Sequence, residues 1–420
     1  MLRLAKRLYP IQRSLAGPGN RETLSLLKQM IPALDVFEIP SGTKFGDWTV
    51  PDEWIIREAR LTDPSGKVIA DFSDHNLHVV GYSTPVDMGI SFEDLQSHLH
   101  SIPDQPEAIP YVSSYYRKEW GFCISEEIRS TLIPGQYHAY VDSEFVKGSM
   151  SNAELVIEGD SPSEVLISTY ICHPQMTNNE ISGPVVAAFV ADWLSNGPKP
   201  HFTYRFVFVP ETIGTIAYIT RTAERLRRRL VAGYILTCIG DDRGYSYLES
   251  RTGDTLTDRV ASRAIGRIDP NYTHRAFIDR GSDERQYGSP GVDLPVGTIG
   301  RSGVGLYPEY HTSLDDFSVV TADGLLGGFD AVKNCIELLE SSPIYSSSSI
   351  GEPFLTAYDL YPTMSKRGSI DIDTQVLLDV FAFADGSRTC EDLADLLGVS
   401  VESVSTALDA LSEADLIYRL

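Results

Sequence analysis

Two residues that can bind a metal ion each follow directly after a long apolar run of the sequence. His173 comes soon after residues 164–171, and Glu211 comes soon after residues 202–209. Neutral imidazole and carboxylate are both common zinc ligands in proteins. A carboxylate at the end of a buried strand is costly unless it is paired or bound to a metal. Each residue also has an ordinary interpretation, His173 as a histidine satisfied within its loop and Glu211 as an acid favoured at a helix N-terminus.

Two later segments contain further residues with suitable chemistry. Asp283 and Glu284 lie in a charged segment among glycines and a proline, which is usually a solvated loop. The apolar run 294–299 follows, so we expect this segment to reach the edge of a sheet. His311 is followed four residues later by Asp315, which suits a ligand whose second ring nitrogen is held by a carboxylate. The alternative is that a Thr or Ser after His311 caps a helix and the histidine is incidental.

The segments around these residues alternate between strand and helix patterns. Short, almost continuously apolar runs predict buried strands, and the patterns between them predict helices. The strands are expected at residues 164–171, 202–209 and 234–239, and the helices at residues 184–194 and 217–230. They indicate an α/β fold with a mostly parallel mixed sheet and helices on both faces. Ligands of such sheets bind beyond the carboxyl ends of the strands, where His173 and Glu211 are expected.

Changes in composition divide the chain into three domains. Residues 45–134 are rich in aromatic and β-branched residues, and the turn sequence at residues 63–66 predicts a hairpin there. We interpret this segment as a β-rich insertion into the catalytic domain. The predicted catalytic domain covers residues 1–44 and 135–340, and a serine-rich linker at residues 341–349 leads to a C-terminal domain at residues 352–420.

Near its start the chain has an amphipathic pattern over residues 20–31, with Asn20 as the expected N-cap of a helix. The insertion contains His75, His78 and His100. These histidines reach the site only if the insertion closes over it or if a neighbouring subunit supplies them. A structural role is the alternative.

The C-terminal domain has the pattern of a winged helix. Helices are predicted at residues 373–383, 389–397 and 401–411, with Thr389 as an N-cap and Gly398 at the turn between the last two. The basic residues of this domain are few, and the last helix has none; they are Lys366, Arg367, Arg388 and Arg419. Because DNA binding needs clustered basic residues, we expect packing or partner docking rather than DNA recognition.

The overall composition argues against several classes of protein. The 420 residues carry a formal net charge of −23, which disfavours a nucleic-acid partner. The five cysteines are widely spread without a CxxC pair, so neither a disulfide framework nor a cysteine zinc site is expected. No apolar run reaches the roughly 20 residues of a membrane span, and no signal-peptide core follows the N-terminus. We expect a cytoplasmic protein without a membrane partner.

These segments together resemble the zinc aminopeptidase-like superfamily, which also includes the glutaminyl cyclases. Within it, the sequence is most similar to a bacterial family of aminopeptidase-like proteins often associated with polysaccharide biosynthesis. Members combine a peptidase domain, an inserted β domain and a C-terminal winged helix, and the resemblance runs nearly end to end. Besides the segments above, it is carried by Tyr9-Pro10-Ile11, Arg13-Ser14, Arg21-Glu22-Thr23-Leu24, Asp47-Trp48-Thr49-Val50-Pro51, Asn76-Leu77-His78-Val79-Val80, His100, Pro103-Asp104-Gln105-Pro106 and Trp120-Gly121-Phe122-Cys123.

The resemblance implies the ligands of a metal site. The superfamily uses a histidine, a bridging aspartate, a pair of glutamates, a second aspartate and a late histidine. Carried over, His173 is the first ligand, Glu211 the carboxylate ligand and His311 the last. The bridging position falls on Asn179, three residues before Ser182, where the resemblance leads us to expect an aspartate.

This chain departs from the family pattern in ways that bear on the metal count. Asn179 is a neutral and weaker ligand than aspartate, Thr237 or Cys238 stands near the place of the second aspartate, and Pro210 stands in the place of the general-base glutamate. We therefore expect one zinc ion rather than two.

The departures also leave the general base open. Glu180 is next to Asn179 and is able to replace the missing carboxylate ligand after a small shift of the loop. The base is expected to be Glu180, Asp283 or Glu284, and these three are the candidate catalytic residues.

The function implied is hydrolysis of an amide or peptide bond by a zinc-activated water, as in an aminopeptidase acting on a small peptide or amide substrate. One alternative is an amide deacylase or cyclase that acts on an amino sugar or a specialised metabolite. Another is a catalytically degenerate binding or scaffold protein, and a third is a DNA-binding regulator, which the acidic charge disfavours. The sequence leaves a homo-oligomer open.

Overall fold

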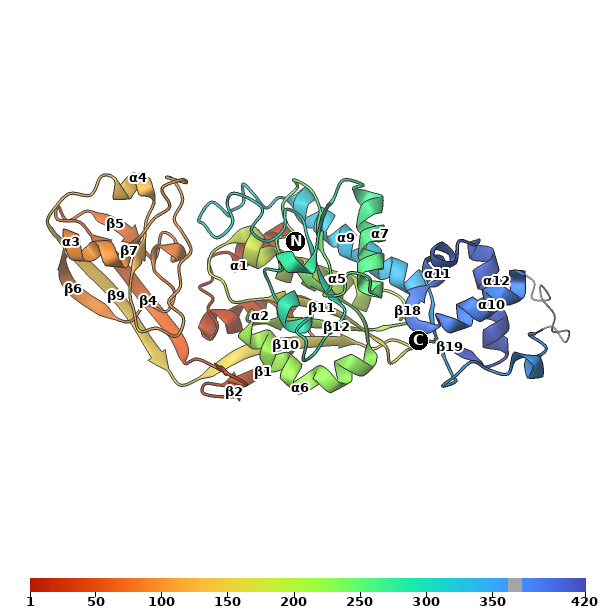
Figure 1. The fold of residues 1–420 in the computed structure, drawn as a ribbon. Coiled ribbons are helices and arrows are strands. Elements are labelled where there is room, and N and C mark those ends of the chain that lie inside the picture. The colour runs from red at the N-terminus through yellow and green to blue at the C-terminus, as the bar shows by residue number, and fades with distance from the viewer. Residues whose placement is uncertain (362–371) are drawn as a thin grey trace.

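The computed structural model describes residues 1–361 and 372–420 and has three parts in a row. Figure 1 shows the insertion at one end of the elongated molecule, the α/β domain in the middle and the C-terminal domain at the other end. Within the described residues, no helix combines the length and the apolar character needed to cross a membrane.

The α/β domain is built on a mixed sheet of eight strands in the order β1-β10-β12-β11-β13-β16-β14-β15. The four central strands β12, β11, β13 and β16 run parallel to one another. The pairs β1–β10, β10–β12 and β14–β16 are antiparallel. The predicted mostly parallel mixed sheet is therefore confirmed. The strands are β1 (Asp35–Pro40), β10 (Ser149–Ile157), β11 (Glu164–Tyr170), β12 (Thr203–Val209), β13 (Leu230–Leu236), β14 (Ser246–Leu248), β15 (Thr273–Arg275) and β16 (Val296–Gly300).

Helices cover both faces of this sheet because its central strands are apolar on both sides. In β11, Val165 and Ile167 belong to the larger core, while Leu166 between them packs into the core on the other face. The larger core is closed by α1 (Leu2–Leu8), α2 (Pro18–Met30), α5 (Ser182–Ser195), α7 (Leu256–Ile268) and α9 (Ala322–Ser341). The other core is closed by α6 (Ile213–Arg229) and the short α8 (Glu284–Tyr287).

The start of α2 differs from the prediction. The helix begins at Pro18 with Gly17 as its N-cap, so Asn20 lies inside the first turn. Asn20 instead joins separate segments, since its side chain accepts from the Ser14 N–H and donates to the Ile171 carbonyl. Proline suits the first turn of a helix because its missing N–H would have no partner there.

The insertion is a β structure whose core continues into the central domain at Cys172, Ile213 and Ala217. Its four-stranded sheet has the order β5-β4-β9-β6, and the hairpin predicted at residues 63–66 joins β4 to β5. Its elements are β2 (Lys44–Phe45), β3 (Trp48–Thr49), β4 (Glu53–Thr62), β5 (Val68–Asp71), η1 (Asn76–His78), β6 (Val86–Ser91), α3 (Phe92–Leu95), η2 (Gln96–His98), β7 (Leu99–His100), β8 (Phe122–Cys123), α4 (Glu126–Arg129) and β9 (Gln136–Val146).

The predicted end of the insertion at residue 134 is too early. Strand β9 was expected in the catalytic domain, yet its eleven residues pair with β4 and β6 of the insertion. The chain returns to the central sheet after the turn at Lys147 and Gly148, where β10 begins.

The C-terminal domain is a winged helix, as predicted. It contains β17 (Ile344–Ser347), η5 (Leu355–Tyr358), α10 (Ile372–Ala382), β18 (Asp385–Thr389), α11 (Cys390–Leu397), α12 (Val401–Glu413) and β19 (Ile417–Arg419). Thr389 forms a capping box with Asp392, and Gly398 ends α11 in the left-handed region at φ 65°. The expected serine-rich linker is wrong, because β17 pairs with both β18 and β19 and so belongs to this domain. Lys366 and Arg367 lie outside the described residues.

Acidic side chains of α11 dock the winged helix onto α7 of the central domain. Asp392, whose side chain is 2% exposed, lies 3.2 Å from Nε of Arg259 and 3.1 Å from Nη2 of Arg263. Arg263 also pairs with Glu391 at 3.2 Å. The acidic surface of this domain is therefore used, at least in part, inside the molecule.

Replacing Arg259 and Arg263 together by Ala is expected to loosen this docking. Asp392 would keep only the hydrogen bonds of its helix cap, at a cost on the order of 2 kcal/mol. We expect a separate, earlier unfolding transition of the winged helix in calorimetry and faster proteolysis near residue 343. The matched control is Arg267→Ala on the same helix, where the exposed side chain has no ion pair among the described residues. A single transition at the original temperature in the double variant would show that these pairs do not hold the domain.

Candidate functional site

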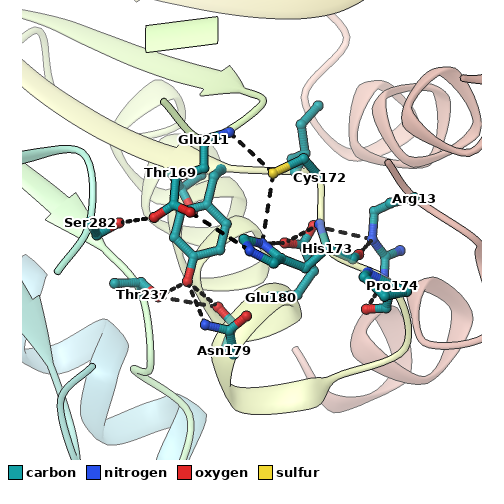
Figure 2. A network of polar contacts seen from close by, with 12 residues as sticks. Arg13, Thr169, Cys172, His173, Pro174, Asn179, Glu180, Glu211, Thr237 and Ser282 are labelled. Atoms are coloured by element: carbon teal, nitrogen blue, oxygen red, sulfur yellow. Dashed lines mark hydrogen bonds and ion pairs between the residues drawn. The ribbon is translucent and has the colours of Figure 1, made fainter. Parts of the chain in front are cut away.

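The imidazole of His173 is fixed from behind by two buried charged side chains. His173 follows β11, and Glu180 lies in the π-helical turn η3 (Thr177–Ile181) that leads into α5. Oε2 of Glu180 accepts from the backbone N–H of His173 at 3.0 Å and lies 3.1 Å from its Nδ1. Arg13 lies 3.1 Å from Oε1 of Glu180 and donates to the His173 carbonyl at 2.9 Å. Figure 2 shows this chain of contacts, which leaves Nε2 of His173 directed away from it.

Glu211 meets His173 on that open side. It follows β12, and its Oε2 lies 3.7 Å from Nε2 of His173. Its Oε1 accepts from the Ser282 hydroxyl at 2.8 Å, and its backbone N–H donates to the sulfur of Cys172 at 3.2 Å. The two strand-end residues predicted from the apolar runs are thus brought together, as the parallel pairing of β11 and β12 requires.

His311 completes the group from a distant loop. Its ring centroid lies 5.6 Å from that of His173, and its ring stacks on Tyr310 at 4.0 Å. Its buried Nε2 has no hydrogen-bond partner among the described residues. Burial, with a smaller contribution from His173, lowers the pKa of His311 to about 3, so the ring is neutral and able to donate a lone pair.

The expected partnership between His311 and Asp315 is wrong. The Asp315 carboxylate is saturated by the N–H groups of Asn178 and Asn179, at 2.6 and 2.9 Å, and by the hydroxyls of Thr177 and Tyr307, both at 2.8 Å. Asp315 therefore holds the turn that contains Glu180 rather than the histidine. The helix-capping alternative is also wrong, because residues 310–316 form no helix.

Asn179 and Thr237, which stand in the places of the two family aspartates, join a neutral hydrogen-bond cluster. The Asn179 amide donates to the Tyr170 hydroxyl at 2.8 Å, and the Thr237 hydroxyl contacts both Tyr170 and the Asn179 carbonyl. The side-chain oxygen of Asn179 is buried without a partner among the described residues. A hydrogen-bonded Tyr–Thr–Asn cluster is poorly suited to a second metal ion, which favours carboxylates.

The three candidate bases have different surroundings. Glu180 is engaged on the far side of His173, so its placement argues against the roles predicted for it as base or replacement ligand. Glu284 accepts from the N–H groups of Gly281 and Ser282 and from Thr298, which makes it a structural anchor of its loop and again contradicts the prediction. Asp283 remains a candidate.

Asp283 is buried close to Glu211. Its Oδ1 accepts from the Thr212 N–H at 2.8 Å. Burial and the charge of Glu211 raise the pKa of Asp283 to about 8. A carboxyl group of this kind is able to accept and release a proton near neutral pH.

The donors at this site have the chemistry that a zinc ion needs, although they are not arranged as a finished metal site. The described residues contain no group of three or more His, Cys, Asp or Glu side chains that already has the arrangement of a metal site. The chemistry nevertheless fits, since His311 has an unpartnered buried Nε2 and His173 directs its own Nε2 at Glu211. Two ligands of one tetrahedral zinc ion are separated by about 3.3 Å. The observed 3.7 Å between His173 and Glu211 is only slightly longer.

A loop of the insertion closes one side of the site. Pro110 forms an isolated β-bridge with Thr312, and the Tyr111 N–H donates to the His311 carbonyl at 2.9 Å. The Tyr111 ring packs edge-on against both His173 and His311, at 5.5 and 5.1 Å. Its hydroxyl lies 3.2 Å from that of Tyr115. The sequence analysis did not identify these tyrosines, although three tyrosines within residues 111–116 are a detectable signal.

The histidines of the insertion have other contacts. His78 bonds the Cys123 carbonyl at 2.8 Å, and His75 packs edge-on against Tyr9.

Arg13 was likewise missed as a site residue. The sequence alone does not predict that the Arg13 side chain is buried beneath His173.

Strained backbone is concentrated around the site. Tyr115, Thr212 and His311 have φ values of 45°, 65° and 56°, a region that non-glycine residues rarely adopt. Each costs roughly 1–3 kcal/mol, and such residues cluster at functional sites. The surrounding hydrogen bonds must hold them there, as the Thr212 N–H to Asp283 and the His311 carbonyl to Tyr111 do.

Known proteins match this chain over its whole length. A family described as a domain of unknown function (DUF4910) matches residues 2–342, and a winged helix-turn-helix family matches residues 343–419. A Clostridium acetobutylicum protein, named for polysaccharide biosynthesis and an aminopeptidase-like domain, is 34% identical over 415 residues, which cover 99% of this chain and 95% of that protein.

Solved structures agree with this match. The crystal structure of a candidate peptidase from Clostridium acetobutylicum has a TM-score of 0.81 and 33% identity, covering 100% of this chain and 95% of that one. A zinc aminopeptidase from Bacillus subtilis has a TM-score of 0.57 at 13% identity, covering 79% and 93%, and shares the fold.

The fold and the arrangement of strand-end residues define an aminopeptidase-like α/β protein. The chain belongs to the bacterial DUF4910 family of aminopeptidase-like proteins, with an inserted β domain and a C-terminal winged helix. The family resemblance seen in the sequence is confirmed.

Proposed function

We propose that this protein is a zinc-dependent hydrolase that cleaves an amide or peptide bond of a small substrate, as an aminopeptidase does. The observation that carries the proposal is the arrangement of His173, Glu211 and His311. Nε2 of His173 lies 3.7 Å from the Glu211 carboxylate, the His311 ring lies 5.6 Å from the His173 ring, and the buried Nε2 of His311 has no partner among the described residues. The proposal is for one zinc ion, because the Asn179 and Thr237 positions carry no carboxylate.

His173, Glu211 and His311 would hold the zinc ion, which would supply a Lewis acid that polarises a carbonyl group and lowers the pKa of water. Other residues of the chain orient the ligands and transfer the proton. Glu180 holds Nδ1 of His173 and thereby keeps Nε2 free, and Arg13 neutralises the buried Glu180 carboxylate. Ser282 fixes the orientation of Glu211. Asp283 is proposed to receive the proton that water loses and to pass it to the leaving amine.

The name of the Clostridium acetobutylicum relative favours a second candidate within the same chemistry. A protein linked to polysaccharide biosynthesis has access to amides of amino sugars. Deacylation of such an amide uses the same site, so the two candidates differ in substrate rather than in mechanism.

The test is metal content together with turnover. The purified, zinc-loaded protein should contain one zinc per chain and should hydrolyse at least one member of a panel of aminoacyl amides and N-acyl amino sugars, with loss of turnover on chelation. Loss of a residue that only hydrogen-bonds to a metal ligand lowers metal affinity by roughly 10- to 100-fold. Glu211→Gln removes a proposed ligand itself, so we expect a larger loss of zinc affinity. Glu224→Gln, an exposed residue of α6, is the matched control.

Two results would count against the proposal. Zinc that binds equally well to the Glu211→Gln protein would remove Glu211 from the ligand set. A zinc-loaded wild-type protein without chelator-sensitive turnover on any panel member would favour a scaffold role instead.

A further inference from the structure

A cavity of about 310 Å³ opens beside Glu211 and is not used by the chemistry described above. Its walls come from both the catalytic domain and the insertion. Because Glu211 is one of its lining residues, whatever fills the cavity is next to the reacting bond. The volume is at the small end of ligand sites and suits one ring with its substituents rather than an extended chain.

Aromatic side chains of the insertion form one wall. Trp48, Tyr115 and Tyr116 all line the cavity, and they are 39%, 40% and 52% exposed. Two of the rings are held in place by their hydroxyls, since Tyr116 donates to the Thr49 carbonyl at 3.0 Å and Tyr115 contacts Tyr111. Three exposed aromatic rings at one cavity are unusual for a free surface and suit a ligand whose ring presents an apolar face to them.

Arg285 is the cation of this cavity. It is exposed, and of the described residues that line the cavity no other carries a positive charge. One Nη atom donates to the Thr212 hydroxyl at 3.0 Å, which orients the guanidinium group. Among the described residues, no carboxylate forms an ion pair with it, although the chain has a net charge of −23. An oriented guanidinium without an anionic partner suits recognition of a carboxylate in the ligand.

We propose that this cavity binds the part of the substrate that adjoins the scissile amide, and that this part is a six-membered ring with an apolar face and a carboxylate. The ring lies against Trp48, Tyr115 and Tyr116, and the carboxylate pairs with Arg285. This proposal rests on the proposed hydrolase function for the position of the amide, but the binding of the ring does not depend on turnover.

Two kinds of molecule have this chemistry, an aromatic acid and a uronic acid. Binding to the full-length protein is measured by titration calorimetry with 4-aminobenzoate and glucuronate, each beside its uncharged counterpart, aniline or glucose. We expect at least one acid to bind roughly 10- to 100-fold more tightly than its neutral counterpart. A difference in affinity between 4-aminobenzoate and aniline would identify the ring as aromatic, and a difference between glucuronate and glucose would identify it as a sugar.

Variants separate the contributions of ring and charge. Arg285→Met should bring the acid-to-neutral ratio of the preferred pair close to one. Trp48→Ala should weaken the acid several-fold while preserving the ratio. Arg280→Met, on the same loop and packed over Phe277, is the matched control and should leave the ratio at its wild-type value.

Turnover is tested in parallel with alanyl-4-aminobenzoate against alanyl-anilide, and with N-alanyl-glucuronosylamine against N-alanyl-glucosylamine. The carboxylated member should have the higher kcat/KM, and Arg285→Met should remove that preference. Selective binding without turnover supports the cavity and overturns the hydrolase function. Turnover without any carboxylate preference, or a preference that survives Arg285→Met, overturns the proposal for the cavity.

Discussion

Replacing Asp283 by Asn is expected to lower kcat by roughly 10²- to 10⁴-fold while zinc content stays at the wild-type level. Asparagine has nearly the shape of aspartate and still offers an oxygen to the Thr212 N–H, so the loop should keep its position. It cannot carry the proton that the reaction moves. The measurement is kcat on the best substrate of the amide panel, with zinc determined on the same samples.

The control for this variant is Asp279→Asn, an exposed residue on the same loop, which should keep full activity. Zinc content gives the decisive comparison, because Glu211→Gln should lose the metal and Asp283→Asn should not. Full kcat in Asp283→Asn would exclude Asp283 as the proton acceptor. Loss of both kcat and zinc would make it a positioning residue for Glu211.

Replacing Arg13 by Met is expected to destabilise the protein by about 3–5 kcal/mol, because it leaves the buried Glu180 carboxylate without a cation. Arg13 and Glu180 have side chains that are only 1% exposed, so water cannot replace the missing partner. Arg13 also donates to the carbonyls of Leu8 and His173, which would lose those hydrogen bonds. Thermal unfolding should shift downward by on the order of 10 °C.

Arg251→Met is the matched control, because Arg251 forms a two-pronged pair with Asp293 at 2.6 and 2.7 Å on the surface. Loss of an exposed pair costs about 0–1 kcal/mol. The double variant Arg13→Met with Glu180→Gln should be more stable than Arg13→Met alone, since it removes the uncompensated charge. An Arg13→Met protein as stable as Arg251→Met would show that the buried pair contributes nothing net.

The parts of the fold that could be predicted are those whose signal is local. The strands before His173 and Glu211 are buried at every residue because both of their faces are covered, and the largely apolar runs that result are visible in the sequence. Parallel pairing then places both residues at one edge of the sheet. The N-cap at Thr389 and the turn at Gly398 are equally local, and both were predicted correctly.

The parts that could not be predicted depend on pairing over long distances. Strand β9 alternates buried and exposed residues as a half-buried strand should, but that pattern does not say which sheet it joins. Arg13 looks like any surface arginine until the fold places it beneath His173. The spacing between His311 and Asp315 suggested a pair, yet nearer N–H groups and hydroxyls saturate the Asp315 carboxylate.

The contacts between the insertion loop and the His311 loop also determine when, during folding, the proposed metal ligands come together. The Ile109 N–H donates to the Ser313 hydroxyl across a separation of 204 residues, and Arg13 reaches the His173 carbonyl across 160. Contacts this distant in sequence give a high contact order, and they form late because long loops must close first. A ribosome that has not yet made residues 309–313 holds a chain with Arg13, His173 and Glu211 but without His311, the third proposed ligand. Under the proposed function, the nascent chain would therefore lack hydrolase activity until the last steps of folding bring His311 to the site.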